Sequence, residues 1–429
     1  MMINVARSFC YCVFIAVSVS AQFGWREIPA SPVSTSRFDD IVFVNKDYGW
    51  IAGGNGVVYR TTNGGTTWTG TNSGKGYIRA IGFADTLKGW IGTFSLLRPL
   101  CSTTDGGITW SDVDLPGSDT AAAGVCGIYV LDSLHIFAVG QYSGPAQFIK
   151  TSDGGKSWSV FMLDSVAHGL VDCYFLNPDT GFAVGHIGTS VVSTKQSVIL
   201  QTTDGGTTWM RIYVSDRYYT NAWKIFFVNG NVAYVASETY SQTILPYLAR
   251  TIDSGKTWTS LPSPIDMQGV GFISPEHGWV SGWGSTFYET TDSGKTFTKL
   301  SFGNNTNRYR KLNDTLMVSV GQRMYKYERL PVVSVEQEST VPVRFSLHQN
   351  YPNPFNPVTR IEYTLHEPGK VVLEVYSIIG EYIATLTHDI RMAGTHTVDW
   401  NAANVSSGVY YYRLQTSFGV QTKKMIVIK

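Results

Sequence analysis

One eight-residue pattern occurs six times in this chain, and its regular recurrence constrains the fold more than any other feature. The copies share the form Thr-x-Asp/Asn-x-Gly-x-Thr/Ser-Trp/Phe. They occupy residues 61–68, 103–110, 151–158, 202–209, 251–258 and 290–297, and their closing aromatics lie 39 to 51 residues apart. Self-similarity with a period of about 40–50 residues is typical of propeller blades or solenoid turns. The sequence therefore predicts a repeat architecture.

Each copy has the composition of a tight turn between two strands. The short polar side chain at its third position can accept hydrogen bonds from backbone N–H groups of the turn. The glycine at its fifth position can adopt the positive φ that such a turn needs. The closing Trp or Phe has a large apolar surface to bury between sheets. We therefore expect a structural role, not a catalytic or metal-binding one, for Asn63, Asp105, Asp153, Asp204, Asp253 and Asp292.

This pattern resembles the Asp box, or BNR repeat, of β-propellers. That group includes bacterial sialidases, sortilin-type receptors, xyloglucan-cleaving hydrolases and photosystem II assembly factors. Stretches such as GWIAG at 49–53 make the repeats look most like those of the photosystem II assembly factors. The resemblance implies that each box joins the third and fourth strands of a blade, on the face away from the usual active site.

The number of blades follows from the strands around the boxes. A seventh unit at 307–328 has three strand-like runs and no box. Residues 24–29 begin with Trp25, as the strands after the boxes begin with an aromatic, so residues 22–30 are predicted to supply its fourth strand. The expected fold is all-β, with a seven-bladed propeller over 22–330 that the N-terminal strand closes, leaving few free strand edges. A six-bladed ring with 307–328 outside it is the alternative.

Residues 1–21 have the features of a secretory signal peptide. Arg7 precedes a short apolar core at 9–19, and small residues precede a cleavage position before Gln22. No other segment is apolar and long enough for a transmembrane helix. Removal of the signal would take Cys10 and Cys12 with it.

Three cysteines then remain, namely Cys101, Cys126 and Cys173. An odd number does not make a disulfide framework. Cys126 and Cys173 fall on inner strands of adjacent blades, so one bridge or two buried free thiols are both open. Their spacing does not suit zinc, and no metal or cofactor is expected.

The composition changes after Leu330. Residues 331–344 read as a linker, and 345–429 as a small Ig-like β-sandwich. The stretch NYPNPFNP at 350–357, together with 371–381, 393–402 and 406–414, closely resembles the type A sorting domain of type IX secretion substrates. The resemblance implies export by the type IX machinery, to the medium or the outer-membrane surface of a Gram-negative-type cell. An ordinary stalk domain is the alternative.

Candidate site residues lie on the face opposite the boxes, where four consecutive blades carry longer connections. Exposed aromatics there could stack on a sugar ring or a peptide: Trp283, Trp223, Tyr218 and Tyr219. For Trp223, packing in the channel as core is the alternative. Four arginines at or just before inner strands would make a positive mouth suited to carboxylates: Arg37, Arg79, Arg217 and Arg308.

The function is less constrained than the fold. The 33 basic and 32 acidic residues nearly balance, which disfavours nucleic acid or anionic lipid as the partner. No nucleophile, metal or cofactor motif is present. We therefore expect a non-enzymatic secreted propeller that binds a glycan or a protein. One alternative is a secreted glycoside hydrolase, sialidase-like or other, which needs two suitably spaced carboxylates. Another is a photosystem-assembly-factor-like scaffold, which fits the export tail poorly.

Overall fold

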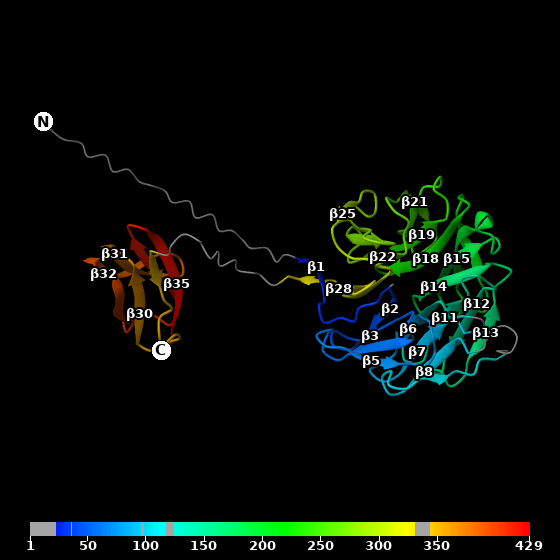
Figure 1. Cartoon of the computed structure of the whole chain (residues 1–429), viewed down its shortest axis with the longest axis horizontal. Coiled ribbons are helices and arrows are strands. Elements are labelled where there is room, and N and C mark those ends of the chain that lie inside the picture. The colour runs from blue at the N-terminus through cyan, green and yellow to red at the C-terminus, as the bar shows by residue number, and fades with distance from the viewer. Residues whose placement is uncertain (1–22, 36, 96–97, 117–123, 331–343) are drawn as a thin grey trace. The chain divides into compact units, whose positions relative to one another are not determined.

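The computed structural model describes residues 23–35, 37–95, 98–116, 124–330 and 344–429, and the chain forms two compact units, 1–332 and 333–429 (Figure 1). The described residues are almost entirely strands and turns, with one 3-10 turn, η1 (Val192–Thr194). No helix among them has the length and apolar character needed to cross a membrane. The proposed signal peptide, with Cys10 and Cys12, lies outside the described residues.

The first unit is a ring of antiparallel four-stranded sheets (Figure 1). The first strands of these sheets are β2 (Phe38–Phe43), β6 (Ile78–Phe83), β10 (Gly127–Val130), β14 (Gly169–Phe175), β18 (Thr220–Phe227), β22 (Gly269–Phe272) and β26 (Arg308–Asn313). Each first strand contacts the next, and β26 contacts β2. These contacts close the ring and leave the first strands around a central channel.

The other three strands of each sheet lie progressively farther from the channel. The second strands are β3 (Gly49–Gly53), β7 (Gly89–Thr93), β11 (Ile136–Gly140), β15 (Gly181–Ile187), β19 (Ala233–Thr239), β23 (Gly278–Ser281) and β27 (Leu316–Val320). The third strands are β4 (Val57–Thr61), β8 (Leu100–Thr103), β12 (Gln147–Thr151), β16 (Gln196–Thr202), β20 (Tyr247–Thr251), β24 (Phe287–Thr290) and β28 (Met324–Arg329). The fourth are β5 (Thr69–Asn72), β9 (Ser111–Asp112), β13 (Ser159–Met162), β17 (Met210–Val214), β21 (Thr259–Pro262), β25 (Thr298–Leu300) and β1 (Phe23–Glu27).

The start of the chain completes the sheet that begins with β26. β1 pairs antiparallel with β28, with Trp25 opposite Tyr327, and the sheet order is β1-β28-β27-β26. Trp25 also packs edge-on against Trp279 of the preceding sheet, at 5.2 Å between ring centroids. Pairing the first and last strands of the first unit in one sheet removes a free edge that would otherwise be open to association.

The repeated turn is held by its own side chains, as the copy at 103–110 illustrates. Thr103 Oγ1 donates to Asp105 Oδ1 at 2.7 Å and accepts from the backbone N of Gly107 at 3.0 Å. Asp105 accepts from the backbone N and Oγ1 of Thr109, at 2.9 and 2.6 Å. Gly107 has a φ of 89°, a left-handed conformation in which glycine is favoured. The third-position side chains are thus occupied within their turns.

The closing aromatic lies one residue before the fourth strand rather than opening it, which corrects the sequence prediction by one position. Trp209, for example, precedes Met210, the first residue of β17. Its ring lies 5.1 Å from that of Phe148 in the neighbouring sheet. Second-strand aromatics also join sheets: Trp50 stacks on Phe83 at 3.6 Å, and its Nε1 donates to Gly106 O at 2.8 Å. The apolar core of the ring therefore lies between sheets.

The second unit consists of two antiparallel sheets with a shared apolar core. One sheet contains β29 (Phe345–Leu347), β30 (Val358–Leu365) and β33 (Gly394–Asn401), and the other contains β32 (Tyr382–Arg391), β31 (Gly369–Ser377), β34 (Gly408–Thr416) and β35 (Gly419–Val427). Tyr363 and Tyr412, one from each sheet, are fully buried. The proline-rich stretch is anchored by Asn350, whose Nδ2 donates to Thr359 Oγ1 at 2.9 Å.

The cysteines of the first unit are free thiols. Cys101, Cys126 and Cys173 are all buried and unpaired. The sequence left open one disulfide or two free thiols for Cys126 and Cys173, and the structure shows two free thiols.

Candidate functional site

The first strands start at one end of the channel and finish at the other. We call the end formed by their first residues the strand-start mouth, and the end formed by their last residues the strand-end mouth. The strand-start mouth holds Arg37 and Asp39 beside Gln268 and Asn307, residues that are distant in sequence. The repeated turns follow third strands, so they lie at the opposite end from the strand-start mouth.

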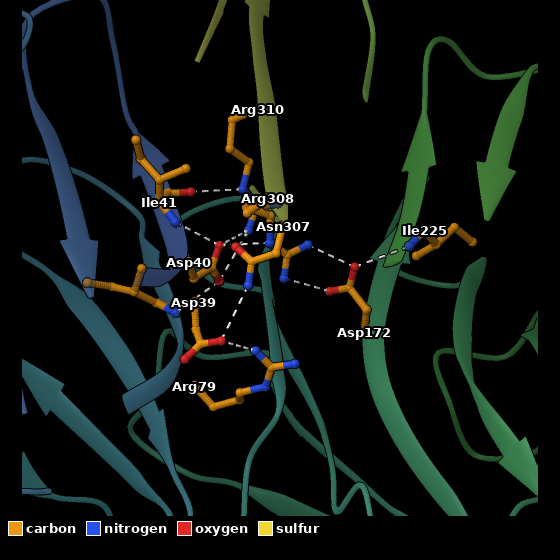
Figure 2. A network of polar contacts seen from close by, with 10 residues as sticks. Asp39, Asp40, Ile41, Arg79, Asp172, Ile225, Asn307, Arg308 and Arg310 are labelled. Atoms are coloured by element: carbon orange, nitrogen blue, oxygen red, sulfur yellow. Dashed lines mark hydrogen bonds and ion pairs between the residues drawn. The ribbon is translucent and has the colours of Figure 1, made fainter. Parts of the chain in front are cut away.

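An ionic network spans the channel between the two mouths (Figure 2). Arg308 on β26 donates from Nη1 to Asp172 Oδ2 at 2.8 Å and from Nη2 to Asp172 Oδ1 at 3.0 Å. Its Nε lies 2.9 Å from Asp40 Oδ1. Arg310 also bonds Asp40, at 3.1 Å. Burial would raise the pKa of Asp172, but the ion pair with Arg308 holds it below its ordinary value. The network thus ties β2, β14 and β26 together.

A second cluster of charged side chains surrounds Asp39, closer to the strand-start mouth. It accepts from Arg37 Nε at 3.1 Å, and it also binds Arg79 and the Tyr77 hydroxyl. Asn307 Nδ2 lies 3.3 Å from the same carboxylate (Figure 2). Burial acts to raise the pKa of Asp39, whereas Arg79 and Arg37 lower it, and the net shift is downward. Asp39 is therefore held as a carboxylate.

Because these aspartates pair with the arginines, the mouth does not have the positive charge that the sequence predicted. Arg37, Arg79 and Arg308 do converge near the channel, but all three are buried and paired with aspartates. Arg217 lies apart from them: its Nη1 donates to Leu245 O at 2.8 Å, and its guanidinium lies 4.9 Å from the Tyr247 ring. The sequence reasoning missed the aspartates, although two consecutive Asp residues in an otherwise apolar strand were a visible signal.

Two of the predicted tryptophans meet at one carboxylate. Glu238, at the end of β19, accepts from Trp223 Nε1 at 2.5 Å and from Trp283 Nε1 at 3.2 Å. Trp283 is 49% exposed, and the Arg37 guanidinium lies 4.2 Å from its ring. Trp223 is only 9% exposed and stacks on Tyr142 at 5.1 Å. Trp223 therefore packs as core, while Trp283 presents a fixed aromatic surface at the strand-start mouth.

The two tyrosines lie in the connection before β18. Tyr218 and Tyr219 are exposed, and Tyr219 has a φ of 61°, an unusual value for a non-glycine residue. The Tyr219 carbonyl accepts from the backbone N of Tyr240 at 2.8 Å. Among the described residues, no ring contact joins these tyrosines to Trp283.

Buried polar groups without partners lie next to Glu238. Asn221 faces Glu238 across the β18–β19 pair and is fully buried. Neither atom of its amide, nor Ser237 Oγ, has a hydrogen-bond partner among the described residues. Buried polar groups are ordinarily bonded to protein, to water or to a ligand. The exposed ring of Trp283 thus lies on a carboxylate that is itself surrounded by buried polar groups.

The acid–base character of this mouth is limited. Burial raises the pKa of Asp266, which accepts from the backbone N of Thr239 at 2.9 Å. The pKa of Asp39 is shifted the other way. Within the described ranges, no group of three or more His, Cys, Asp or Glu side chains is arranged to hold a metal ion.

Comparison with known proteins identifies the second unit and the architecture of the first. Residues 349–429 match the family model of the secretion system C-terminal sorting domain. A search of curated proteins gave no significant match.

Three solved structures illustrate the likeness of the fold. A structure of YCF48 bound to a D1 peptide has a TM-score of 0.53 at 17% identity, over 73% of this chain and 96% of that one. The WD40 β-propeller domain of Doa1 has a TM-score of 0.50 at 9% identity, over 71% and 97%. The Niastella koreensis GH74 enzyme has a TM-score of 0.51 at 13% identity, over 94% and 67%. The chain is thus similar in fold to β-propellers, both enzymatic and non-enzymatic.

Proposed function

We propose that this protein is an exported, non-enzymatic seven-bladed β-propeller that binds an extracellular glycan or protein ligand at its strand-start mouth. One observation carries the proposal: the half-exposed ring of Trp283 is fixed by Glu238 on its Nε1 and by Arg37 against its face. An aromatic ring already held in place loses little conformational freedom when a ligand stacks on it.

The chemistry around Trp283 suits a ligand with both an apolar face and hydrogen-bonding groups. The ring can stack on a sugar face or on an apolar side chain. Glu238 and Arg37, which contact the ring, supply an acceptor and a donor beside it. A peptide ligand has a precedent in the fold, since one similar propeller, YCF48, is bound to a D1 peptide.

A glycoside hydrolase remains the second candidate because one carboxyl at this mouth has a raised pKa. Burial raises the pKa of Asp266, which is the direction of shift that a general acid needs. Such an enzyme also needs a second carboxylate at a suitable separation. The buried Asp39 is paired with two arginines, which makes it a poor base or nucleophile. Binding without hydrolysis is therefore the function we propose.

Export rests on the second unit. The sorting-domain match covers 349–429, and we propose that this unit directs passage through the type IX machinery after a signal peptide at 1–21 is removed. The seven-bladed assignment takes each four-stranded sheet of 22–330 as a blade, with β1 as the fourth strand of the last. Residues 331–344 would then link the propeller to the sorting domain at 345–429.

The test is a binding screen of the purified protein against immobilised glycans and extracellular peptides. Trp283→Ala should abolish specific binding without changing the unfolding midpoint. Ile252→Ala is a matched control, because Ile252 is exposed in a repeated turn at the opposite end of the ring, and it should bind as the parent does. Equal binding by Trp283→Ala would contradict the site, and cleavage of a bound glycan would establish the hydrolase instead.

A further inference from the structure

The strand-end mouth of the channel holds a cavity that the proposed function does not use. Its volume is about 460 Å³. The last residues of several first strands line it, including Phe43, Val130, Phe227 and Asn313, with Lys224 and Arg308 from further along the channel. It is therefore a pocket within the channel, at the opposite end from Trp283.

Lys224 is the unexplained group of this cavity. Its side chain lines the cavity and is only 2% exposed, yet its Nζ has no hydrogen-bond partner among the described residues. A buried amine without partners is costly. Burial, together with the neighbouring Arg308, holds the pKa of Lys224 well below its ordinary value. A nearby anion would reverse this, because an opposite charge favours the protonated amine.

The other deep cations of the cavity already have partners. Arg308 is engaged by Asp172 and Asp40, and Arg310 by Asp40 and by the carbonyl of Ile41. Among the described residues that line the cavity, Lys224 is the deep basic side chain left without a hydrogen-bonded carboxylate.

Lys311 also lines the cavity, nearer the end of β26, and its Nζ pairs with Asp314 at 2.8 Å. Four basic side chains thus line the cavity, and three carboxylates pair with the three other than Lys224. Protonation of Lys224 leaves an excess of one positive charge, which one monoanion would balance.

Aromatic side chains form part of the walls of the cavity. Tyr129 and Tyr174 lie 4.6 Å apart between ring centroids and are both half-buried. Phe43 lines the same cavity and is also half-buried. These rings offer an apolar surface to a bound molecule, which an inorganic ion would not use.

We propose that the strand-end cavity binds a small monoanionic organic acid, its carboxylate on Lys224 Nζ and its apolar body between Tyr129, Tyr174 and Phe43. The carboxylate accepts charge-assisted hydrogen bonds from an amine that otherwise lacks a partner. The site is separate from the strand-start mouth, so its test is independent of the proposed function.

The probe is benzoate, titrated calorimetrically into the full chain, with benzyl alcohol as its uncharged counterpart. Benzoate should bind saturably with one site and at least about tenfold more tightly than benzyl alcohol. Lys224→Met should reduce benzoate affinity by about tenfold or more and remove the preference for the anion. Lys299→Met is the matched control and should keep benzoate affinity within about threefold, because Lys299 is exposed on the outer strand β25 and does not line the cavity.

The remaining outcomes also decide the proposal. Absence of saturable binding, or equal benzoate affinity in the parent and Lys224→Met, overturns it. Phosphate binding as tightly as benzoate overturns the organic part, since the aromatic walls would then contribute nothing. If Lys224→Met does not fold, the benzoate titration is done with Lys224→Gln instead. A crystal structure with benzoate should put a carboxylate oxygen within hydrogen-bonding distance of Nζ, and benzoate bound elsewhere counts against the site.

Discussion

Arg308 on β26 and Asp172 on β14 form a buried, two-pronged ion pair across the channel, with N–O distances of 2.8 and 3.0 Å. The two residues are 136 positions apart in sequence, so the pair fixes the last sheet against a sheet from the middle of the ring. Asp172 sits where the β14–β15 register shifts, an irregularity that re-aims side chains.

Breaking this pair should destabilise the ring strongly. Asp172→Ala leaves Arg308 buried and without its bidentate partner, and we expect a loss of roughly 3–5 kcal/mol in the free energy of unfolding. Because the folded pKa of Asp172 is lowered, its contribution is present above the unfolded pKa and is lost as pH falls through the folded value. Urea unfolding followed by tryptophan fluorescence measures the loss.

Asp314→Ala is the control for that experiment. Asp314 also pairs with a cation, Lys311, but its side chain is almost fully exposed, and exposed pairs contribute little. Its unfolding midpoint should match that of the parent. A second arm, Asp172→Leu with Arg308→Met, should recover much of the lost stability because it leaves no unpaired buried charge. An Asp172→Ala variant as stable as Asp314→Ala would show that the channel network is not structural.

The first repeated turn has Asn63 where the other five have aspartate. Replacing Asn63 with aspartate should therefore stabilise the protein. Asn63 accepts from the backbone N of Thr67 and donates from Nδ2 to its Oγ1, both at 2.9 Å. Asp204 instead accepts from both the backbone N and Oγ1 of Thr208, and these bonds contribute most to lowering its pKa to about 2. Asn63→Asp should therefore raise the melting temperature at pH 7 by roughly 1–3 °C, since bonds to a carboxylate are stronger.

The pH dependence separates this effect from a change in packing. A carboxylate with a lowered folded pKa stabilises above its unfolded pKa, near 4, and the gain disappears as pH falls through the folded value of about 2. The melting temperature of Asn63→Asp should thus converge on that of the parent near pH 2. Asp204→Asn should show the reverse change over the same range. A gain that persists at pH 2 would contradict the charge-based account.

Much of the ring follows from local sequence, but its channel does not. The repeated turns are predictable because Thr103, Asp105 and Gly107 bond within five residues. Trp25 indicated the closing strand because it repeats a local pattern. The channel network depends on Asp39, Asp40, Asp172 and Arg308, which meet only when four distant strands close into a ring. No local spacing encodes such meetings, so the pairing of these arginines with these aspartates could not be predicted.

Burial of the three cysteines should keep them unreactive until the protein unfolds. Burial raises the pKa of Cys101 to about 12 and also raises the pKa values of Cys126 and Cys173. A thiol reagent needs an accessible thiolate. In a protein lacking residues 1–21, we therefore expect no labelling at pH 8 when folded and three labelled thiols in denaturant without reductant. Fewer than three labelled thiols after unfolding would reveal a disulfide.

A protein that lacks the sorting domain should remain in the periplasm. A chain that ends at Leu330 keeps the strands of the first unit, which is compact by itself, and lacks the residues that match the sorting family. In the native host it should accumulate in the periplasm rather than in the medium or at the surface. Fractionation and immunoblotting measure this, with full-length Trp283→Ala as the exported control. Export of the truncated chain would show that the tail is not the sorting signal.

Lys224→Met should make the protein more stable, contrary to the usual result of changing a buried residue. Lys224 lies among Arg308, Arg79, Asp172 and Asp40, and its pKa is far below the ordinary value. The amine therefore loses its proton at a lower pH in the folded protein than in the unfolded chain, whose lysine pKa lies near 10.4. Unfolding takes up a proton, so parental stability rises with pH up to about 10.

Methionine removes both the unpartnered amine and this proton uptake. We expect Lys224→Met to gain about 1–3 kcal/mol in the free energy of unfolding at pH 7. The gain should shrink as pH rises toward 10, because the parent then recovers stability by up to about 1.4 kcal/mol per pH unit. Urea unfolding at pH 7, 8.5 and 10 measures it, with Lys311→Met as the control that shows no such trend. A gain independent of pH would mean that Lys224 is charged in the fold and has a partner there.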